Sequence, residues 1–520
     1  MKIVLISTSS DIQAFGLRTI SSCLKKEGFN VKLIFLPNLF WIKYEERSLR
    51  DVVKIARGAG LIGVSLMTNF FDNAVQVTQR LKKDLNIPII WGGIHPTIRP
   101  EESLNHADMV CIGEGEETIV ELAKRMQEKK NYQKVQGVWL KNKNKLIKNK
   151  LRPPLTDLNS IPFQDYDYKN HYILHNNLVQ KMDEKLFKRH SEGIYMTIPT
   201  RGCPFGCSYC CNNILNKMYH KKQIVRERSI DNLIEELVFV KDKLPVIDTI
   251  KFDDDAFFIK KVEEIRKFSQ RYKRLIGLPL IVTGANPSTL TREKLALLVE
   301  AGLTTLRMGI QTGSQRTKEL YGRRDTNEQV KKAVEIINEF KNKIQRPVYD
   351  IILENPWETE EDEAESLLFL CQLPSPYVLQ FFSLTFYPGT DFYNRAKKEG
   401  LITDDLKEVY RKYFHGVQKS YINSLFFLLN EYGIGGGGIP PKIMSLLVNP
   451  KYKKLKINLV LYYLLKAGSL PYHLNWLFYS YKNGLIKVLK NKDWYRITDY
   501  LKKRWNFERG YNKSREARIN

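Results

Sequence analysis

Three cysteines stand close together in the middle of the sequence, at a spacing that could hold a metal cluster. Cys203, Cys207 and Cys210 form the pattern C-x3-C-x2-C, and the Gly and Pro residues between them favour a tight loop over a helix. Thiolates are the usual ligands of iron–sulfur clusters, and a [4Fe–4S] cluster normally takes four of them. Three ligands would leave one iron open to bind a substrate or a cofactor. The spacing therefore predicts a [4Fe–4S] cluster with one exchangeable position.

Two other uses of these cysteines, a disulfide framework and a zinc knuckle, fit the sequence less well. The cysteines far from this loop, Cys23, Cys111 and Cys371, are scattered singly through apolar segments, which favours a reducing compartment. Structural zinc takes four ligands with paired spacings, and no second C-x2-C or H-x3-H pair follows. Cys211 lies outside the pattern, and we expect it to be a buried free thiol.

Length and composition predict a globular protein of two to four domains. The chain has 520 residues, of which 43% are hydrophobic, enough for sizeable cores. The N-terminal MKIVLIS is too short an apolar run for a signal peptide, and no run reaches the ~18 apolar residues of a membrane span. We therefore expect a cytoplasmic protein, with peripheral membrane contact as an option.

The first 126 residues alternate short apolar runs with amphipathic stretches, which predicts a doubly wound, Rossmann-like parallel sheet. Ligands of such sheets lie beyond the carboxyl ends of the strands. The loops that we expect there are rich in Gly, Ser and Thr, residues that allow close backbone approach to a ligand. These loops are Ser7–Ser10, Met67–Phe70, Gly92–Thr97 and Gly113–Glu116.

Residues 194–401 show a second alternation of strands and helices, with six strand signals. About six such units fit a partial (β/α)6 barrel, whose active site lies at the strand carboxyl ends. Asp253, Asp254 and Asp255 follow one of these strands, where their mutual repulsion needs a cation or hydrogen-bond donors nearby. An Asp-capped loop that opens the next helix is the alternative. Small and hydroxyl-bearing residues follow a later strand in Arg307–Ser314.

The two remaining segments are a connector, residues 127–193, and a C-terminal region, residues 402–520. The connector contains a hairpin pattern around Asn142–Asn144 and then a Pro-rich exit. The C-terminal region is mostly helical by pattern. Residues 441–520 hold 18 Lys or Arg and 4 Asp or Glu, more than half of the net charge of +26. A helical cap over the barrel, a membrane-binding surface and a nucleic-acid surface all fit this composition.

The cysteine loop resembles the radical S-adenosylmethionine (SAM) enzymes, whose signature is C-x3-C-x2-C with an aromatic residue before the last cysteine. The resemblance implies that Cys203, Cys207 and Cys210 bind the cluster, that its open iron chelates SAM, and that Tyr209 lies beside the adenine. The turn G-[IV]-[EQ]-[ST]-G-S, the strand ending in P-x-E-T and the Y-P-G-T loop follow in the family's order. By this resemblance the further contacts to SAM are Asp254, Asp255, Gln311 and Ser314.

The segment from Trp91 to Leu122, with GG-x-HPT and GEGE, resembles the cobalamin-binding domain of class B, methyltransferase-like radical SAM enzymes. The implied cobalamin contacts are Gly92, Gly93, His95, Gly113 and Glu114. The motif D-x-H-x-x-G is missing, so no histidine is expected to bind cobalt at that position. His95 has a second interpretation, a histidine hydrogen-bonded at a strand end. A flavodoxin-like module without ligand, or one for another nucleotide, is the alternative for the domain.

The resemblance implies an enzyme that forms a 5′-deoxyadenosyl radical and methylates an unactivated carbon. For this chain we expect a small-molecule, hydrophobic or lipid-like substrate and an electron donor such as flavodoxin or ferredoxin. The alternatives are a cobalamin-binding cyclase or oxidase without methyl transfer, a tRNA-modifying enzyme and a non-catalytic sensor. We do not expect nucleic acid as the partner. No catalytic residue beyond the cofactor contacts can be named from the sequence.

Overall fold

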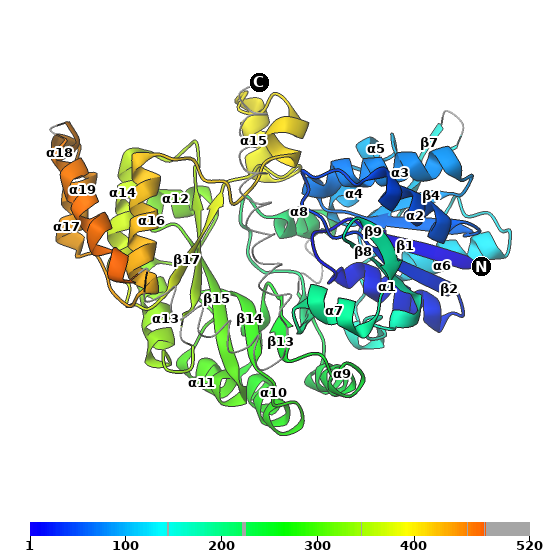
Figure 1. Cartoon of the computed structure of the whole chain (residues 1–520), viewed down its shortest axis with the longest axis horizontal. Helices are drawn as coiled ribbons and strands as arrows, with labels where there is room; N and C mark the ends of the chain where they lie inside the picture. The colour runs from blue at the N-terminus through cyan, green and yellow to red at the C-terminus, as the bar shows by residue number, and fades with distance from the viewer. Residues whose placement is uncertain (143–144, 221–224, 345, 455, 473, 475–520) are drawn as a thin grey trace.

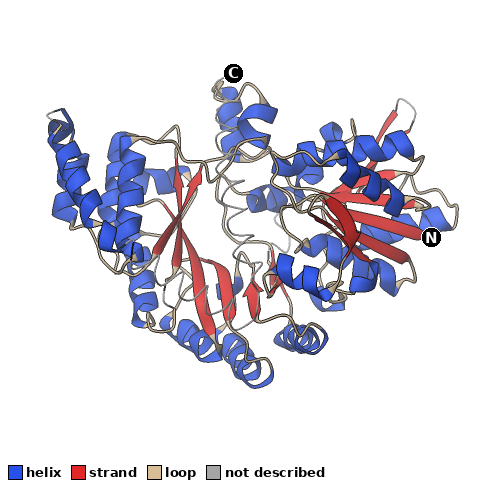
Figure 2. Cartoon of the chain, in the orientation of Figure 1, coloured by secondary structure: helices blue, strands red, loops and turns tan. Residues whose placement is uncertain are grey.

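The computed structural model describes residues 1–142, 145–220, 225–344, 346–454, 456–472 and 474. Within these ranges the chain forms two large sheets of mainly parallel strands, each with its own helices (Figures 1 and 2). A third, two-stranded sheet pairs β11 (Thr200–Arg201) with β12 (Arg226–Glu227). The predicted α/β class is therefore confirmed.

The first sheet has nine strands in the order β7-β6-β5-β4-β3-β1-β2-β8-β9. Its parallel centre consists of strands that are buried on both faces, as their near-continuous apolar sequences require. These strands are β1 (Lys2–Ser7), β2 (Asn30–Phe35), β3 (Leu61–Ser65), β4 (Ile89–Gly92) and β5 (Met109–Cys111). Five of the strands predicted from the sequence are thus present, and the sheet is doubly wound.

Helices cover both faces of this sheet. One face carries α1 (Phe15–Lys26) and α6 (Glu116–Gln127), whose buried residues share one apolar cluster. The other face carries α2 (Glu46–Ala56) and α3 (Phe71–Asp84), which share a second cluster. Two short helices, α4 (Ile94–Ile98) and α5 (Pro100–Ser103), and the 3-10 turn η1 (Thr68–Phe70) follow strand ends.

The connector extends the first sheet at both edges instead of forming a separate unit. The predicted hairpin consists of β6 (Val138–Asn142) and β7 (Lys145–Lys148), which pair antiparallel beyond β5. A second hairpin, β8 (His171–His175) and β9 (Leu178–Lys181), joins the opposite edge beside β2. The turns η2 (Leu158–Ser160) and η3 (Tyr168–Asn170) and the helix α7 (Glu184–Ser191) complete the connector.

The second sheet is an open, six-stranded parallel barrel in the order β10-β13-β14-β15-β16-β17, with the two end strands unpaired to each other in the described residues. Its strands are β10 (Ile194–Thr197), β13 (Thr249–Phe252), β14 (Leu280–Ala285), β15 (Leu303–Gln311), β16 (Val348–Leu353) and β17 (Val378–Ser383). The intervening helices are α8 (Cys211–Met218), α9 (Ile230–Lys243), α10 (Val262–Leu275), α11 (Arg292–Ala301), α12 (Gln315–Leu320), α13 (Asn327–Glu339) and α14 (Glu360–Leu370), with η4 (Phe257–Ile259). The predicted (β/α)6 barrel is therefore present.

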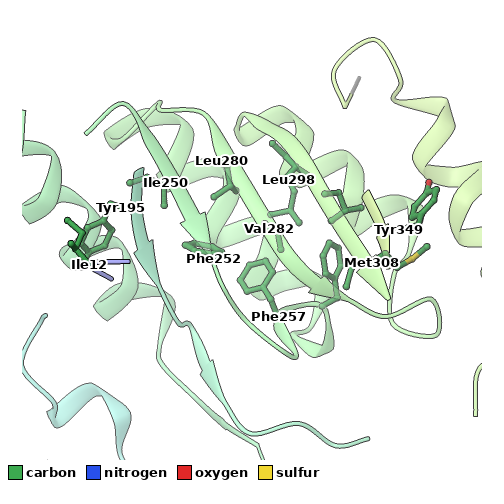
Figure 3. Close-up of a cluster of buried hydrophobic side chains, with 14 of the residues drawn as sticks. Ile12, Tyr195, Ile250, Phe252, Phe257, Leu280, Val282, Leu298, Met308 and Tyr349 are labelled. Carbon is green, nitrogen blue, oxygen red and sulfur yellow. The ribbon is translucent and has the colours of Figure 1, made fainter. Parts of the chain in front are cut away.

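Buried side chains between the barrel strands and their outer helices form the core of the second domain (Figure 3). Alternate strand residues such as Phe252, Val282 and Met308 point to this layer and are fully buried. The same apolar cluster continues into the first domain through Tyr166 and Tyr195, whose rings lie 5.1 Å apart. The two domains therefore share one core at their junction.

After β17 the chain first returns to the N-terminal domain and then forms an outer layer of helices. The return segment contains α15 (Asp391–Lys398) and the π-helix η5 (Leu406–Tyr410). Arg99 pairs with Asp405 at 2.6 Å there, and Tyr410 donates to Glu102 at 2.6 Å. The outer layer, at the left edge of Figure 1, consists of α16 (Tyr421–Ile434), α17 (Pro441–Val448), α18 (Pro450–Lys454) and α19 (Ile457–Gly468). No helix in the described ranges is long and apolar enough to span a membrane.

A fully buried arginine joins the connector to the N-terminal domain. The Arg18 guanidinium donates to the carbonyl oxygens of Ile12, Gln13 and Asp165 at 2.7–3.0 Å. It also stacks between Phe35 and Tyr166, 4.3 and 3.9 Å from their ring centroids. Buried carbonyl groups need such donors because no water replaces them.

We predict that Arg18→Leu lowers the free energy of unfolding by about 3 kcal/mol, because it leaves these buried carbonyl groups without a donor. Chemical denaturation followed by far-ultraviolet circular dichroism measures the change. Arg47→Leu, a change at an exposed residue of α2, is the control and should leave the transition in place. Equal effects of the two substitutions would contradict the role given to Arg18.

Candidate active site

The cysteine loop lies between β11 and α8, beyond the carboxyl end of β10. Its backbone rests on the turn after α12, where Ser208 N–H donates to the Tyr321 carbonyl at 2.9 Å. On the other side, the Asn216 amide of α8 donates to the Cys203 carbonyl at 2.9 Å. The loop is thus fixed from two sides, and the structure brings Cys203, Cys207 and Cys210 close enough to influence one another's ionisation.

Burial raises the pKa of the Cys203 thiol to about 12 and also raises the pKa of Cys207. The Arg323 guanidinium counteracts burial at Cys207. Bound metal would keep these thiols as thiolates, because coordination removes the proton. Cys211 lies beside Cys210, and the two thiols share a hydrogen bond.

The described residues contain no group of three Cys, His, Asp or Glu side chains placed to hold a single metal ion. A [4Fe–4S] cluster makes a different demand, since each of its cysteines binds a different iron atom. The donor set of three thiols on one fixed loop suits such a cluster.

Arg323 connects the cysteine loop to the end of β15. Its side chain is almost fully buried, pairs with Asp325 at 2.8 Å and donates to the Gly309 carbonyl at 2.9 Å. The guanidinium also lies beside the Tyr209 hydroxyl, whose pKa burial raises. Lys318, also buried, lies 3.6 Å from the same Asp325. Two buried cations therefore face one carboxylate behind the cysteine loop.

Gln311 ends β15, and two further polar residues, Arg307 and Asp350, pair between β15 and β16. Gln311 has a left-handed backbone, φ 70°, at a bulge where β15 shifts register against β16. Beside it, Asp350 accepts two bonds from the Nε of Arg307, at 2.8 and 2.9 Å. A non-glycine residue in this conformation is costly and often marks a functional site. Arg323, which lies beside Tyr209, therefore reaches the Gly309 carbonyl two residues before this bulge residue.

The acids after β13 serve different purposes. Asp254 is buried and accepts bonds from Thr200 N, Thr200 Oγ1 and Ala256 N at 2.6–2.7 Å. Burial outweighs these donors and raises its pKa to about 6. Asp255 accepts from the Asn212 amide at 2.8 Å and faces the cavity described below. Asp254 therefore anchors β11, whereas Asp255 is placed to meet a ligand.

Ser314 also has a structural position. It is fully buried, caps α12 by accepting from Thr317 N–H at 3.3 Å, and donates to Asp362 at 2.8 Å. Its hydroxyl is thereby engaged on the helix side of the barrel, and the predicted contact with SAM has no support in this geometry.

A cavity of about 550 Å³ lies between the two domains. One wall consists of the carboxyl ends of the N-terminal strands, including Gly92, Gly93, Gly113 and Glu114. The opposite wall comes from the barrel domain: Thr200, Arg201 and Gly202 before the first cluster cysteine, residues of α8, and Asp253 and Asp255. The cavity therefore extends from the glycine-rich strand ends to the cysteine loop.

Two of these glycines cannot be replaced without strain. Gly93 has φ 105°, and a Cβ there would lie 2.5 Å from the Leu66 carbonyl oxygen. Gly113 has φ 79°, and a Cβ there would lie 2.4 Å from the Tyr219 hydroxyl of the barrel domain. Both positions need the conformational freedom and small size of glycine.

His95 lies outside the cavity lining. Its ring is fully buried, 3.4 Å from Thr68 Oγ1, and packs against Phe71 and Tyr410. Burial lowers its pKa to about 3, so the imidazole is neutral. The position agrees with the second interpretation from the sequence, a histidine hydrogen-bonded within the fold, and gives no support to a corrin contact.

The Glu114 carboxylate joins the two domains at the cavity. Arg226 donates to both of its oxygens, at 2.9 and 2.7 Å, and Arg201 approaches to 3.3 Å. Leu155 N–H donates a further bond at 2.8 Å. Burial acts to raise the pKa of Glu114, but Arg226 and Arg201 outweigh it, so the pKa lies below its ordinary value. The group stays ionised and binds the barrel domain.

Sequence reasoning missed the residues that complete this site, namely Arg201, Tyr219, Arg226, Arg323 and Asp350. Arg201 stands next to the signature Gly-Cys, and Asp350 stands inside the strand that ends in P-x-E-T. These positions could have been noticed. Arg226 and Tyr219 carry no local signal, since their roles depend on contact with Glu114 and Gly113 of the other domain.

Comparisons with known families agree with this division of the chain. Residues 1–123 match the family described as B12 binding domain, and residues 197–370 match the family described as Radical SAM superfamily. The first match covers the parallel strands β1 to β5 with their strand-end glycines, and the second covers the barrel from the end of β10 through α14.

Similar curated proteins include an uncharacterized methyltransferase of Pyrococcus horikoshii, 28% identical over 71% of this chain and 76% of the relative. The bacteriochlorophyllide d C-8(2)-methyltransferase of Chlorobaculum tepidum is 22% identical over 74% of this chain and 78% of its own. The anaerobic magnesium-protoporphyrin IX monomethyl ester cyclase of Cereibacter sphaeroides is 26% identical over 48% of this chain and 39% of its own.

Solved structures share the fold at low sequence identity. The cobalamin-dependent SAM radical enzyme OxsB, with aqua-cobalamin and SAM bound, has a TM-score of 0.64 at 16% identity, over 96% of this chain and 75% of that one. The radical SAM methyltransferase TsrM of Kitasatospora setae has a TM-score of 0.61 at 18% identity, over 76% of each chain. The chain therefore contains an N-terminal B12-binding domain followed by a radical SAM domain.

Proposed function

We propose that this enzyme binds a [4Fe–4S] cluster, SAM and cobalamin, and methylates an unactivated carbon of a hydrophobic small molecule. The single observation that supports this proposal most is the shared cavity, which joins the glycine-rich ends of the B12-binding domain to Asp255 and the cysteine loop. Cofactors held at its two ends would act on one substrate without exposing it to bulk water.

When bound, these groups supply a 5′-deoxyadenosyl radical from reduced cluster and SAM, and a transferable methyl group from methylcobalamin. The protein holds and orients them. Cys203, Cys207 and Cys210 would hold the cluster, and the loop contacts to Tyr321 and Asn216 fix its position. The buried cations Arg323 and Lys318, which both lie near Asp325, would offset the negative charge of the thiolates.

The polar groups around the cysteine loop match the parts of SAM. Asp255 can accept from its ammonium group, and Arg323 can donate to its carboxylate, the geometry for which a guanidinium is suited. Gln311 and Asp350, on neighbouring strands, can hydrogen-bond the ribose hydroxyls. Tyr209 remains the candidate for the adenine contact. Asp254 and Ser314 would position these groups from behind.

On the cobalamin side, Gly92, Gly93 and Gly113 provide backbone without side chains at the cavity wall, so that a large flat ligand can approach closely. Glu114 would mainly hold the two domains together through its pair with Arg226, and would contact the ligand less. In the described residues no histidine lines the cavity, so we propose that no imidazole binds cobalt.

The substrate proposal takes its support from the relatives and the cavity. Two curated relatives are methyltransferases, one of them acting on a bacteriochlorophyllide, which is a large and mainly apolar molecule. We propose a hydrophobic or lipid-like substrate, an electron donor such as flavodoxin or ferredoxin, and peripheral membrane contact through the C-terminal region. Of the 18 Lys and Arg residues in 441–520, 12 follow residue 474 and lie outside the described residues.

Cyclisation without methyl transfer is the second candidate, because a curated relative is a cyclase. Incubation with SAM labelled in its methyl group separates the two reactions. Methylation places the label in a substrate from a cell extract, whereas a cyclase would release 5′-deoxyadenosine and leave the substrate unlabelled. Protein with a full cluster that neither labels a substrate nor releases 5′-deoxyadenosine would contradict both reactions.

We predict that Cys203→Ala, Cys207→Ala and Cys210→Ala each reduce iron content after anaerobic reconstitution to background, because each thiol binds a different iron. SAM cleavage to 5′-deoxyadenosine should be lost as well. Cys211→Ala is the matched control, since this thiol lies next to Cys210 but outside the loop pattern, and it should retain both properties. Equal loss in the control would show that the cluster ligands are assigned wrongly.

We predict that the full-length protein binds hydroxocobalamin with a visible spectrum that lacks histidine coordination. Gly113→Ala should weaken this binding about tenfold, or ~1.4 kcal/mol, because a Cβ there collides with Tyr219 at the cavity wall. Gly58→Ala is the control, as Gly58 has a similar φ of 76° but open space around it. Titration followed by absorbance measures the affinity, and unchanged binding by Gly113→Ala would count against this cavity as the site.

A further inference from the structure

Helix α19 is apolar on two opposite faces. One face packs inward: Leu461 and Leu465 lie against the core cluster, and the Tyr432 hydroxyl of α16 donates to the Leu465 carbonyl at 2.9 Å. The other face points to solvent. The exposed fractions of its side chains are 50% for Ile457, 63% for Val460, 67% for Tyr463 and 66% for Leu464.

The outward residues form a stripe, since their spacing of three and four places them along one side of the helix. Leu446 of α17 is exposed as well, as are Leu470 and Leu474 after α19. A helix that is apolar all round is normally buried or in contact with lipid. We call these seven residues the α19 face. It lies on the outer layer of the barrel domain, on the side away from the B12-binding domain (Figure 1).

The charge around the α19 face has one sign. Residues 441–474 contain six lysines and no Asp, Glu or Arg. Lys451, Lys454 and Lys456 are exposed directly before α19. Lys466 differs from them, because it pairs with Glu431 of α16. The exposed cations therefore gather at the N-terminal end of the apolar stripe, next to it on the surface.

An anionic lipid surface fits both the apolar stripe and the lysines of this face. Acyl chains can contact the stripe, and lipid phosphates can pair with the lysines. A second copy of the chain fits less well. A two-fold contact through this face would cover the apolar stripe but offer the lysines no acids, because residues 441–474 contain no Asp or Glu. Nucleic acid would meet the lysines but leave Val460, Tyr463 and Leu464 without an apolar partner.

We propose that the α19 face is the membrane-binding surface of this enzyme, and that it binds bilayers that contain anionic lipids. The helix lies in the interface with its outward stripe among the upper acyl chains and with Lys451, Lys454 and Lys456 at the phosphates. Helix α16 connects this surface to the barrel, since Phe426 of α16 packs on Phe381 of β17 with ring centroids 6.2 Å apart. Resting on the proposed function, the surface would hold the barrel near a membrane-dissolved substrate.

Co-sedimentation with vesicles tests the proposal. The full-length protein is loaded with the iron–sulfur cluster and cobalamin, and SAM and substrate are left out. The probes are vesicles of phosphatidylcholine alone and of phosphatidylcholine with phosphatidylglycerol, each at low and high salt. The protein should pellet with the anionic vesicles at low salt and much less at high salt, because salt screens the attraction between the lysines and the lipid phosphates. Vesicle binding and SAM cleavage are measured in separate assays. A failure of the membrane proposal can therefore be distinguished from a failure of the proposed function.

Two variants separate the apolar and the charged parts of the α19 face. Val460→Asn with Leu464→Asn should lower the affinity for anionic vesicles about tenfold, as outward apolar area is lost. Lys451→Gln, Lys454→Gln and Lys456→Gln together should lower it on the order of a hundredfold. The controls are Leu401→Asn, an exposed leucine elsewhere (45%), and the triple change Lys331→Gln, Lys332→Gln and Lys341→Gln on and after α13.

Each outcome decides the proposal. Loss of binding in the α19 variants but not in the controls, with unchanged thermal unfolding, supports it. Equal binding by variants and controls overturns it, as does failure of the wild-type protein to bind anionic vesicles. A concentration-dependent dimer in sedimentation velocity that the Val460→Asn, Leu464→Asn variant abolishes would assign this face to a second copy, and RNA binding lost with the lysines would assign it to nucleic acid.

Discussion

The geometry of the site depends on the carboxylate of Glu114. It lies half-buried between the two domains, with 17% of its side chain exposed, and Arg226, with Arg201 beside it, supplies the positive charge that keeps it ionised there. Removing one member would leave a buried charge without its partner, which is far more costly than losing an exposed pair. The network links the glycine-rich strand ends to the segment before the cysteine loop, at the cavity that lies between them.

Burial and nearby charges also determine the ionisation of the side chains around the cysteine loop. Burial raises the pKa of the Cys203 and Cys207 thiols, so the site would favour protonated, metal-free cysteines if nothing compensated. Arg323 and Lys318 share Asp325, and the Arg323 guanidinium counteracts part of this effect at Cys207. Their excess positive charge is suited to thiolates and to an anionic ligand group, and it links cofactor binding to the turn that also supports the loop backbone.

Membrane contact through the α19 face would complete a division of labour along the chain. The B12-binding domain and barrel enclose a cavity for cofactors, and the outer helices present an apolar surface away from it. The path between the two runs through α16 and β17, whose packing is aromatic and rigid. Delivery of an apolar substrate and protection of radical chemistry would then use different surfaces of one molecule.

The sequence by itself determined the fold class, the six-stranded barrel and the cysteine loop, because strand and helix periods and the C-x3-C-x2-C spacing are local properties. It also located the glycines at Gly92, Gly93 and Gly113, since backbone freedom is a property of the residue. Only the tertiary structure decided how the polar residues divide their work. Asp254 and Ser314 occur in the expected motifs, yet their hydrogen bonds go to Thr200 and Asp362, while Asp255 faces the cavity. The ring of His95 is likewise buried, and its contacts are Thr68, Phe71 and Tyr410 instead of the cavity. The roles of Arg226, Arg323 and the outward stripe of α19 depend on which distant residues lie next to them. A local sequence pattern does not contain that information.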